Sequence, residues 1–328
     1  LKLYNWDLCV NIIPFTDWIQ HRMWHYIDDT HPLYNDANNG KVLSNFIDFW
    51  KRIDDLIGEI IDYGDYIFIV SDHGFSTLRR MIHVNRLFQK ENLLVEKKSG
   101  ISKLLALIGI TQSKLVNIAR KYHLRNIPFI TKAIKRVAPL STKVIGEVDF
   151  RSSKVFAYGY RGVYFNDISI KDYVKRILLS LRDNKKRVIA KLYEREKILW
   201  GPYVYRAPNL ILEPIEGYDI SDLLYKEVFS EPFEGELKKS GTHNETGIFI
   251  AYGCDIKQGL FLKEYINTWD IASTMLISCG IKSLKYLDGK IISEIFKHIP
   301  SIKRYTKRDY LSREIVKAKI RRFLRKNN

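Results

Sequence analysis

Two short apolar runs constrain the fold of this chain more than any other feature of its sequence. They are LCVNII at residues 8–13 and YIFIVS at residues 66–71, and both are rich in β-branched side chains. Such runs are typical of strands that are covered on both faces in a parallel or mixed sheet. Residues 42–63, between them, carry apolar side chains at helical spacing. We therefore predict the unit strand, helix, strand.

The same alternation of element types returns in the second half of the chain. Short apolar segments predict further strands, and longer periodic segments predict further helices. The predicted strands are residues 155–158, 162–165, 209–212 and 247–252, and the predicted helices are residues 171–181 and 269–279. The alternation places the chain in the α/β class.

Cysteine content and the length of the apolar runs exclude two classes of protein. The 328 residues contain only Cys9, Cys254 and Cys279, which are too scattered to form the disulfide framework of a small secreted scaffold. The longest apolar runs are far shorter than the roughly 20 residues that a membrane-spanning helix needs. The sequence therefore argues against an integral membrane protein as well.

The positive charge of the chain is concentrated in two segments. The formal net charge is +17, yet residues 89–148 hold 12 Lys and Arg against 3 Asp and Glu, and residues 301–328 hold 11 against 2. Each segment thus contributes +9, and the rest of the chain carries about −1. We expect a nearly neutral core at residues 1–88 and 149–300, interrupted by a basic helical insertion at residues 89–148 that caps it. Residues 301–328 are expected to form a basic amphipathic tail, with its helix at residues 308–326.

Three segments place Asp and His residues next to predicted strands. Asp17 and His21 follow the first strand at a spacing that puts both on one face of a helix, and Asp72 and His73 directly follow the second strand. His243 precedes the strand predicted at residues 247–252. Each motif alone also fits a solvated or hydrogen-bonded surface group. Together, a carboxylate and imidazole mixture at the strand ends of one sheet suits zinc or manganese.

In this order, FTDWIQHRMW, VSDHGF and GTHNETGIFIAYG resemble the motifs of the type I phosphodiesterase/nucleotide pyrophosphatase family of the alkaline phosphatase superfamily. Within that family the chain is most similar to the archaeal phosphohydrolase/phosphomutase-like branch. The stretches VDFRSSKVFAYGYRGVYFN, ILWGPYVYRAPNLIL and TWDIASTML followed by YLDGKII also resemble the family. The resemblance implies a central mixed, mostly parallel sheet with helices on both faces, plus the helical insertion.

The resemblance also implies a centre of two divalent metal ions, zinc or manganese. Asp17, His21 and His243 would complete one site, and Asp72 and His73 would supply part of the other. The remaining ligands of the family, an Asp and the Thr or Ser nucleophile, are expected upstream of this sequence. We therefore expect the chain by itself to be inactive and to bind about one metal ion tightly.

The reaction implied by the resemblance is hydrolysis of a phosphoester. A metal-activated Thr or Ser would attack phosphorus in line, and water would then hydrolyse the covalent phospho-enzyme. His25, His31 and Arg161 are expected in substrate contacts or behind the metal ligands, with Arg161 pointing outward from its strand. The positive charge of the insertion favours a phosphorylated small molecule or phosphodiester larger than a simple ester, such as a nucleotide, a phospholipid headgroup or a polyprenyl-linked phosphate.

Two alternatives to this function stay open. The first is a non-catalytic protein that binds an anionic membrane surface, or less favourably nucleic acid, through the basic tail. Such binding would weaken with salt and survive a chelator, whereas the hydrolase would lose activity. The second, less favoured, is a phosphomutase, whose additional domain the sequence does not contain. We expect a cytoplasmic protein, peripheral to the membrane where the tail binds it, unless an upstream segment carries a signal.

Overall fold

The structure is a computed structural model that describes residues 7–97, 144–232, 239–281 and 287–301, with short pieces at 105, 108–110, 114–115, 118 and 121. The chain forms two units. The first comprises Leu1–Trp18, Tyr34–Phe75 and His243–Asn328, and the second comprises Ile19–Leu33 and Ser76–Thr242. Most of the predicted insertion and the tail helix predicted at residues 308–326 lie outside the described residues, so both stay predictions.

The first unit is built on a two-stranded antiparallel sheet. β1 (Tyr66–Val70) pairs with β14 (Phe249–Gly253), with Tyr66 opposite Gly253. Aromatic and aliphatic side chains of this sheet pack against a small core contributed by the segment after β14, by α9 (Thr268–Ser278) and by the 3₁₀ helix η5 (Ser293–Ile295) with its neighbouring residues. The buried residues of that core are Ile256, Ile277, Ile292, Ile295 and Phe296.

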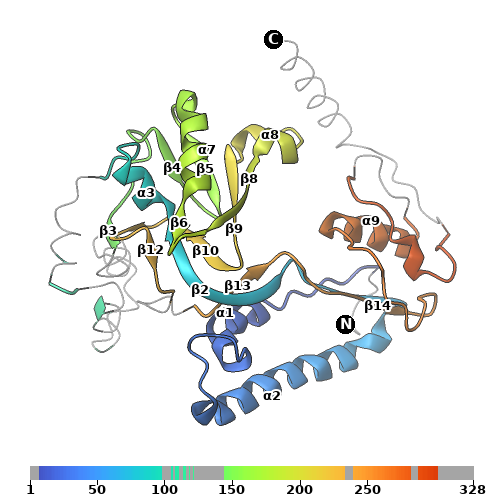
Figure 1. Cartoon of the computed structure of the whole chain (residues 1–328). Helices are drawn as coiled ribbons and strands as arrows, with labels where there is room; N and C mark the ends of the chain where they lie inside the picture. Colours follow the sequence, from blue (N-terminus) through green and yellow to red (C-terminus); the bar gives the residue numbers. More distant parts are fainter. Residues whose placement is uncertain are drawn as a thin grey trace, which may run out of the picture. The chain divides into compact units, whose positions relative to one another are not determined.

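A long amphipathic helix also belongs to the first unit. α2 (Asp36–Ile60) continues into the 3₁₀ helix η1 (Ile61–Tyr63), which leads to β1 (Figure 1). Its sequence repeats apolar residues every three to four positions, which is why it forms a helix with one apolar stripe. The helix predicted at residues 42–63 and the strand predicted at residues 66–71 are therefore confirmed.

The second unit has its main core beside a four-stranded antiparallel sheet of order β4–β5–β9–β8. α3 packs against β4, and α7 packs against β8, as Figure 1 shows. The fully buried side chains of this core include Phe88, Val163 and Leu178. The bounds are β4 (Val155–Ala157), β5 (Gly162–Phe165), β8 (Ile189–Glu194), β9 (Leu210–Pro214), α3 (Val84–Lys90), α7 (Lys171–Ser180) and α8 (Arg195–Ile198).

A second sheet is organised around the long strand β2 (Gly74–His83). β10 (Gly217–Ser221) pairs with β2 in parallel, β12 (Phe229–Ser230) pairs with it antiparallel, and β13 (Gly241–Asn244) pairs with it as well. Two small antiparallel pairs complete the strands that the structure describes. They are β3 (Val144–Gly146) with β11 (Leu224–Tyr225), and β6 (Arg182–Asp183) with β7 (Lys186–Arg187).

The prediction for residues 8–13 is wrong. They belong to no strand of the described structure, and Leu8, Val10 and Ile12 are 54–84% exposed. An apolar, β-branched run becomes a strand only where a neighbouring strand offers its backbone groups, and within the described residues none does so here. Conversely, β2 was not predicted, because its sequence, GFSTLRRMIH, mixes polar and apolar side chains without a clear period.

The described residues form a mixed α/β structure with several sheets and six α-helices. Among the strand pairs whose register is known, β2–β10 is parallel and the others are antiparallel. The expected mostly parallel central sheet is therefore not confirmed by this part of the chain. None of the described helices has both the length and the apolar composition needed to cross a bilayer.

Candidate metal centre

The helix α1 (Phe15–Ile27) carries the first two candidate ligands. It begins directly after Pro14, and Asp17 lies in its first turn, where a carboxylate interacts favourably with the positive end of the helix dipole. His21 follows one turn later. A spacing of four residues puts both side chains on the same face of the helix.

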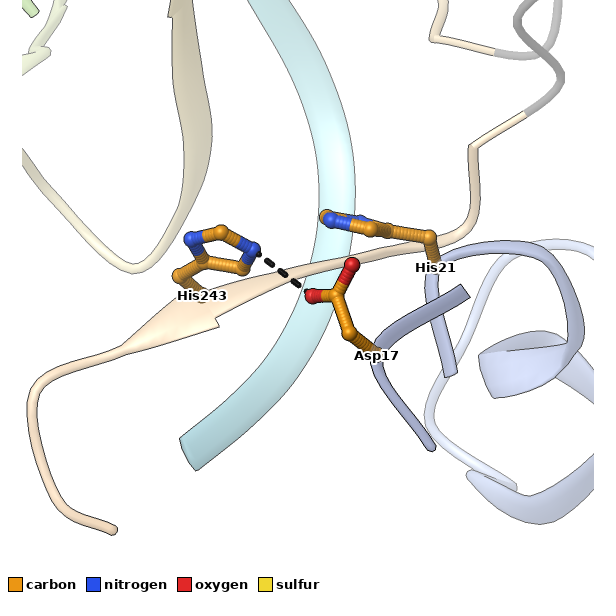
Figure 2. A group of neighbouring side chains, drawn as sticks. All are labelled: Asp17, His21 and His243. Carbon is orange, nitrogen blue, oxygen red and sulfur yellow. Dashed lines mark hydrogen bonds and ion pairs between the residues drawn. The ribbon is translucent and has the colours of Figure 1, made fainter. Parts of the chain in front are cut away.

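The strand β13 brings His243 to these two residues. Nε2 of His243 lies 3.1 Å from Oδ1 of Asp17, and one ligand atom from each of Asp17, His21 and His243 lies within 4.8 Å of the others. Figure 2 shows the Asp17 carboxylate pointing toward the His243 ring, with the His21 ring beside it. The fold thus brings together Asp17, His21 and His243, the three residues that the sequence motifs suggested as ligands of one ion.

His21 is oriented by the backbone of β13. Its Nδ1 lies 2.8 Å from the carbonyl oxygen of Gly241, and the amide of Ser240 donates to the carbonyl oxygen of His21 at 2.7 Å. A histidine whose Nδ1–H donates to a carbonyl carries its lone pair on Nε2. This is a usual arrangement for a metal-ligating histidine, because the second hydrogen bond fixes both the tautomer and the orientation of the ring.

His73 is the fourth side chain of the group. Its ring stacks on that of His243 with the centroids 3.6 Å apart, and its Nε2 lies 3.7 Å from Oδ1 of Asp17 and 3.6 Å from Oδ1 of Asp72. Asp72 itself is exposed. The Asp17 carboxylate is therefore close to two imidazole rings.

The close approach of two backbone segments makes this stacking possible. A Cβ atom on Gly74 would lie 2.0 Å from the carbonyl oxygen of Thr246, and one on Gly247 would lie 2.4 Å from Oγ of Ser71. Side chains at either glycine would push the segment after His243 away from the segment that carries His73. Glycine is thus required at both positions by the space available.

His25 and His31 lie outside the group of candidate ligands. Nδ1 of His31 accepts from the amide of Leu33 at 3.0 Å, and its Nε2 lies 3.3 Å from the carbonyl oxygen of Leu78. Burial lowers the pKa of His31 and also that of His25. Both rings therefore favour the neutral form. The two backbone contacts of His31 hold its ring in place.

Arg161 does not point outward as predicted. It adopts a left-handed backbone conformation, with φ 55°, in the turn between β4 and β5, and its side chain is only 13% exposed. Its Nε donates to Oδ1 of Asp219 at 3.0 Å, and its guanidinium lies over the ring of Tyr160. The reason is electrostatic, since a partly buried guanidinium is stabilised by a carboxylate partner.

The donor set of this centre fits a divalent metal ion. It combines one carboxylate oxygen with two imidazole nitrogens, a set used for zinc at catalytic sites and acceptable to manganese. The orientation of His21 by a carbonyl oxygen supplies the outer hydrogen bond that such sites need.

Comparison with known proteins gives one family match. The family model for type I phosphodiesterase/nucleotide pyrophosphatase matches residues 2–247, a range that includes all five predicted ligands. The chain belongs to this family. The type I phosphodiesterases are part of the alkaline phosphatase superfamily, so the resemblance seen in the motifs is confirmed. No curated protein and no solved structure matches the chain.

Membership of the type I phosphodiesterase family has two general consequences. The family catalyses phosphoester hydrolysis and is generally metal-dependent, which agrees with the Asp17, His21 and His243 group. Its phosphodiester or nucleotide substrates define the class of molecule to test.

Sequence reasoning missed two residues that are linked to this centre through β13. Thr242 precedes His243 and is hydrogen-bonded to Asp219 of β10, with Oγ1 donating to Oδ2 at 3.0 Å. Thr242 lies in the GTHNE motif, where its position next to His243 was an available signal. Asp219 lies in no motif. Its contact with Thr242 forms only because β10 and β13 both pair with β2.

Proposed function

We propose that this type I phosphodiesterase is a metal-dependent phosphoester hydrolase whose Asp17, His21 and His243 hold one divalent ion, zinc or manganese. The observation that carries the proposal is the approach of these three side chains, with ligand atoms within 4.8 Å of one another, in a chain that belongs to this family. Asp72 and His73 would contribute to a second ion beside the first, as in two-metal phosphoesterases.

The residues of the chain have distinct tasks in this reaction. Asp17 supplies negative charge at the centre, and His243 and His21 supply neutral nitrogen ligands. The ion, when bound, polarises a phosphoryl oxygen and favours the deprotonated form of a hydroxyl nucleophile. No residue of this chain is assigned as that nucleophile.

The substrate proposed is a phosphodiester or a nucleotide. Substrates of this class are anionic, and the positive charge of residues 89–148 favours their approach. Nε of Arg161 donates to Asp219. A contact between Arg161 and a substrate phosphate stays a prediction.

The first test is the metal content of the purified protein by elemental analysis. We expect about one zinc or manganese ion per chain to be bound tightly, and we expect it to be lost in His243→Ala. His298→Ala is the matched control, because His298 is an exposed histidine outside the group and should retain the metal. Equal metal content in wild type and His243→Ala would contradict the proposed site.

The second test is hydrolysis of bis(p-nitrophenyl) phosphate. We expect the chain by itself to be inactive, so any turnover that it does show should require the ion: a chelator should remove that turnover, and added zinc or manganese should restore it. Activity that persists after exhaustive chelation would contradict a metal-dependent mechanism.

A further inference from the structure

Three consecutive residues of β13 serve the proposed metal centre in different ways. The carbonyl oxygen of Gly241 faces Nδ1 of His21 at 2.8 Å, and His243 lies 3.1 Å from Asp17. Thr242 lies between them in sequence. Successive side chains of a strand point to opposite faces, so the side chain of Thr242 leaves the strand on the face opposite to His243.

The side chain of Thr242 is held by Asp219. Oγ1 of Thr242 donates to Oδ2 of Asp219 at 3.0 Å, and Thr242 is 3% exposed. A buried hydroxyl of this kind is costly to leave without a partner, which ties the position of β13 to the position of the carboxylate.

Asp219 is itself fixed by two further donors. Nε of Arg161 donates to its Oδ1 at 3.0 Å, and the amide of Ile220 donates to the same oxygen at 2.9 Å. The side chain is 14% exposed. Both carboxylate oxygens are thus engaged, one by the Arg161 turn and β10, the other by β13.

We propose that Asp219 is a positioning residue of the metal centre: through Thr242 it holds β13 where Gly241 orients His21 and His243 reaches the ion. This inference rests on the proposed function. Its physical basis is that metal ligands must be held within about 0.5 Å of their productive positions. Outer hydrogen bonds that provide this are typically worth about 10–100-fold in metal affinity.

The decisive variant is Thr242→Val, which removes the hydroxyl and retains a β-branched side chain. We expect the Kd for manganese, measured by titration calorimetry on the metal-free protein, to rise by about 10-fold or more. Thr242→Ser keeps the hydroxyl and should bind manganese nearly as tightly as wild type. Tyr193→Phe is the matched control, since it removes a hydroxyl that donates to Glu213 at 2.6 Å within the β8–β9 pair, and it should leave the Kd unchanged.

A spectroscopic readout separates positioning from a general loss of stability. The imidazole nitrogen resonances of His243 in the metal-free protein, assigned by their absence in His243→Ala, should shift in Thr242→Val. They should stay in place in Thr242→Ser and in Tyr193→Phe. Asp219→Asn provides a second variant should Thr242→Val not fold. It retains one acceptor oxygen in place of two, so it should weaken manganese binding and shift the same resonances.

The outcomes separate this inference from the proposed function. Tight binding of manganese by both wild type and Thr242→Val, with unchanged His243 resonances, would overturn the positioning role and leave the metal centre intact. An equal loss of affinity in Thr242→Ser would also overturn it, because the hydroxyl would then not be the group that matters. Failure of the wild-type protein to bind any divalent ion would overturn the proposed function and the inference with it.

Discussion

Oδ1 of Asp17 lies 3.1 Å from Nε2 of His243, although the two residues are 226 positions apart in the sequence. The same oxygen lies 3.7 Å from Nε2 of His73, whose ring stacks on that of His243. One carboxylate therefore meets two imidazole rings from two separate segments. This arrangement suits the metal binding proposed above, because a bound ion would offset the cost of gathering several polar groups.

Replacing Asp17 should abolish tight metal binding. Asp17→Asn keeps the shape of the side chain but removes the negative charge that a divalent ion requires, so the Kd for manganese should rise by more than the roughly 100-fold upper range of outer-shell losses. Titration calorimetry measures the effect. Asp48→Asn is the control, because Asp48 is an exposed residue of α2 that forms a surface ion pair with Lys51. A Kd that is the same in Asp17→Asn and Asp48→Asn would argue against Asp17 as a ligand.

A methyl group added at Gly74 should damage both stability and the metal centre. The new Cβ would lie 2.0 Å from the carbonyl oxygen of Thr246, so backbone must shift beside His73. We expect Gly74→Ala to lose about 1–3 kcal/mol of the free energy of unfolding, as overpacked sites do. Urea denaturation provides the measurement.

The matched control for Gly74→Ala is Gly58→Ala. Gly58 lies inside α2 with open space around it, so alanine there should raise the free energy of unfolding by roughly 0.5–1 kcal/mol. Opposite signs for the two substitutions are the expected result. A neutral or stabilising effect at Gly74 would show that the close approach to Thr246 is not maintained in solution.

His83 should make the protein less stable in acid. Its ring stacks on Tyr225, its Nε2 lies 2.8 Å from Oγ of Ser230, and burial lowers its pKa from 6.5 to about 4. Between these values the unfolded chain binds more protons than the folded chain, so stability falls as the pH falls through this window. The His83 contribution to this loss is about 3 kcal/mol at the acid end.

The measurement for His83 is a comparison of urea denaturation at several pH values between about 4 and about 7. Because His25 and His31 also have lowered pKa values, wild type must be compared with His83→Gln, which keeps a polar group near Ser230. The decline in stability should be smaller in the variant. Parallel pH profiles for the two proteins would refute the assignment to His83.

Asp270 should contribute more to stability than an ordinary helix-terminal acid. One of its oxygens accepts from the amide of Asn267 at 2.9 Å to form the capping box of α9, and the other accepts from the amide of Lys290 at 2.8 Å. Asp270→Ala leaves both amides without these partners, so we expect a loss of about 1–3 kcal/mol in the free energy of unfolding. Asp172→Ala, at an exposed position in the first turn of α7, should change it by no more than about 0.5 kcal/mol. Similar losses for both variants would contradict the special role of Asp270.

Several elements were predictable because their signal is local. The helical period of residues 42–63 and the apolar run at residues 66–71 correspond to α2 and β1. The helices predicted at residues 171–181 and 269–279 correspond to α7 and α9. Each element buries one face or stripe of its own residues, and this leaves a periodic pattern in the sequence.

Other features depended on partners that are remote in the sequence. Residues 8–13 have the composition of a strand but no partner strand in the described structure, so the prediction from composition alone was wrong. β2 forms without a clear period because β10, β12 and β13 all pair with it. Arg161 was expected at the surface, whereas Asp219 holds it at a partly buried position.

The sequence by itself determined the family, the α/β class and the identity of the candidate ligands Asp17, His21, Asp72, His73 and His243, because motif order and residue chemistry survive without coordinates. Only the tertiary structure decided that Asp17 meets His243 and His73, that Gly241 orients His21, and that Asp219 holds Thr242. The physical reason is that a hydrogen bond or stacking contact acts over a few ångströms in space. The two partners of such a contact have no fixed separation along the chain, so the contact forms only once the strands and helices have packed together.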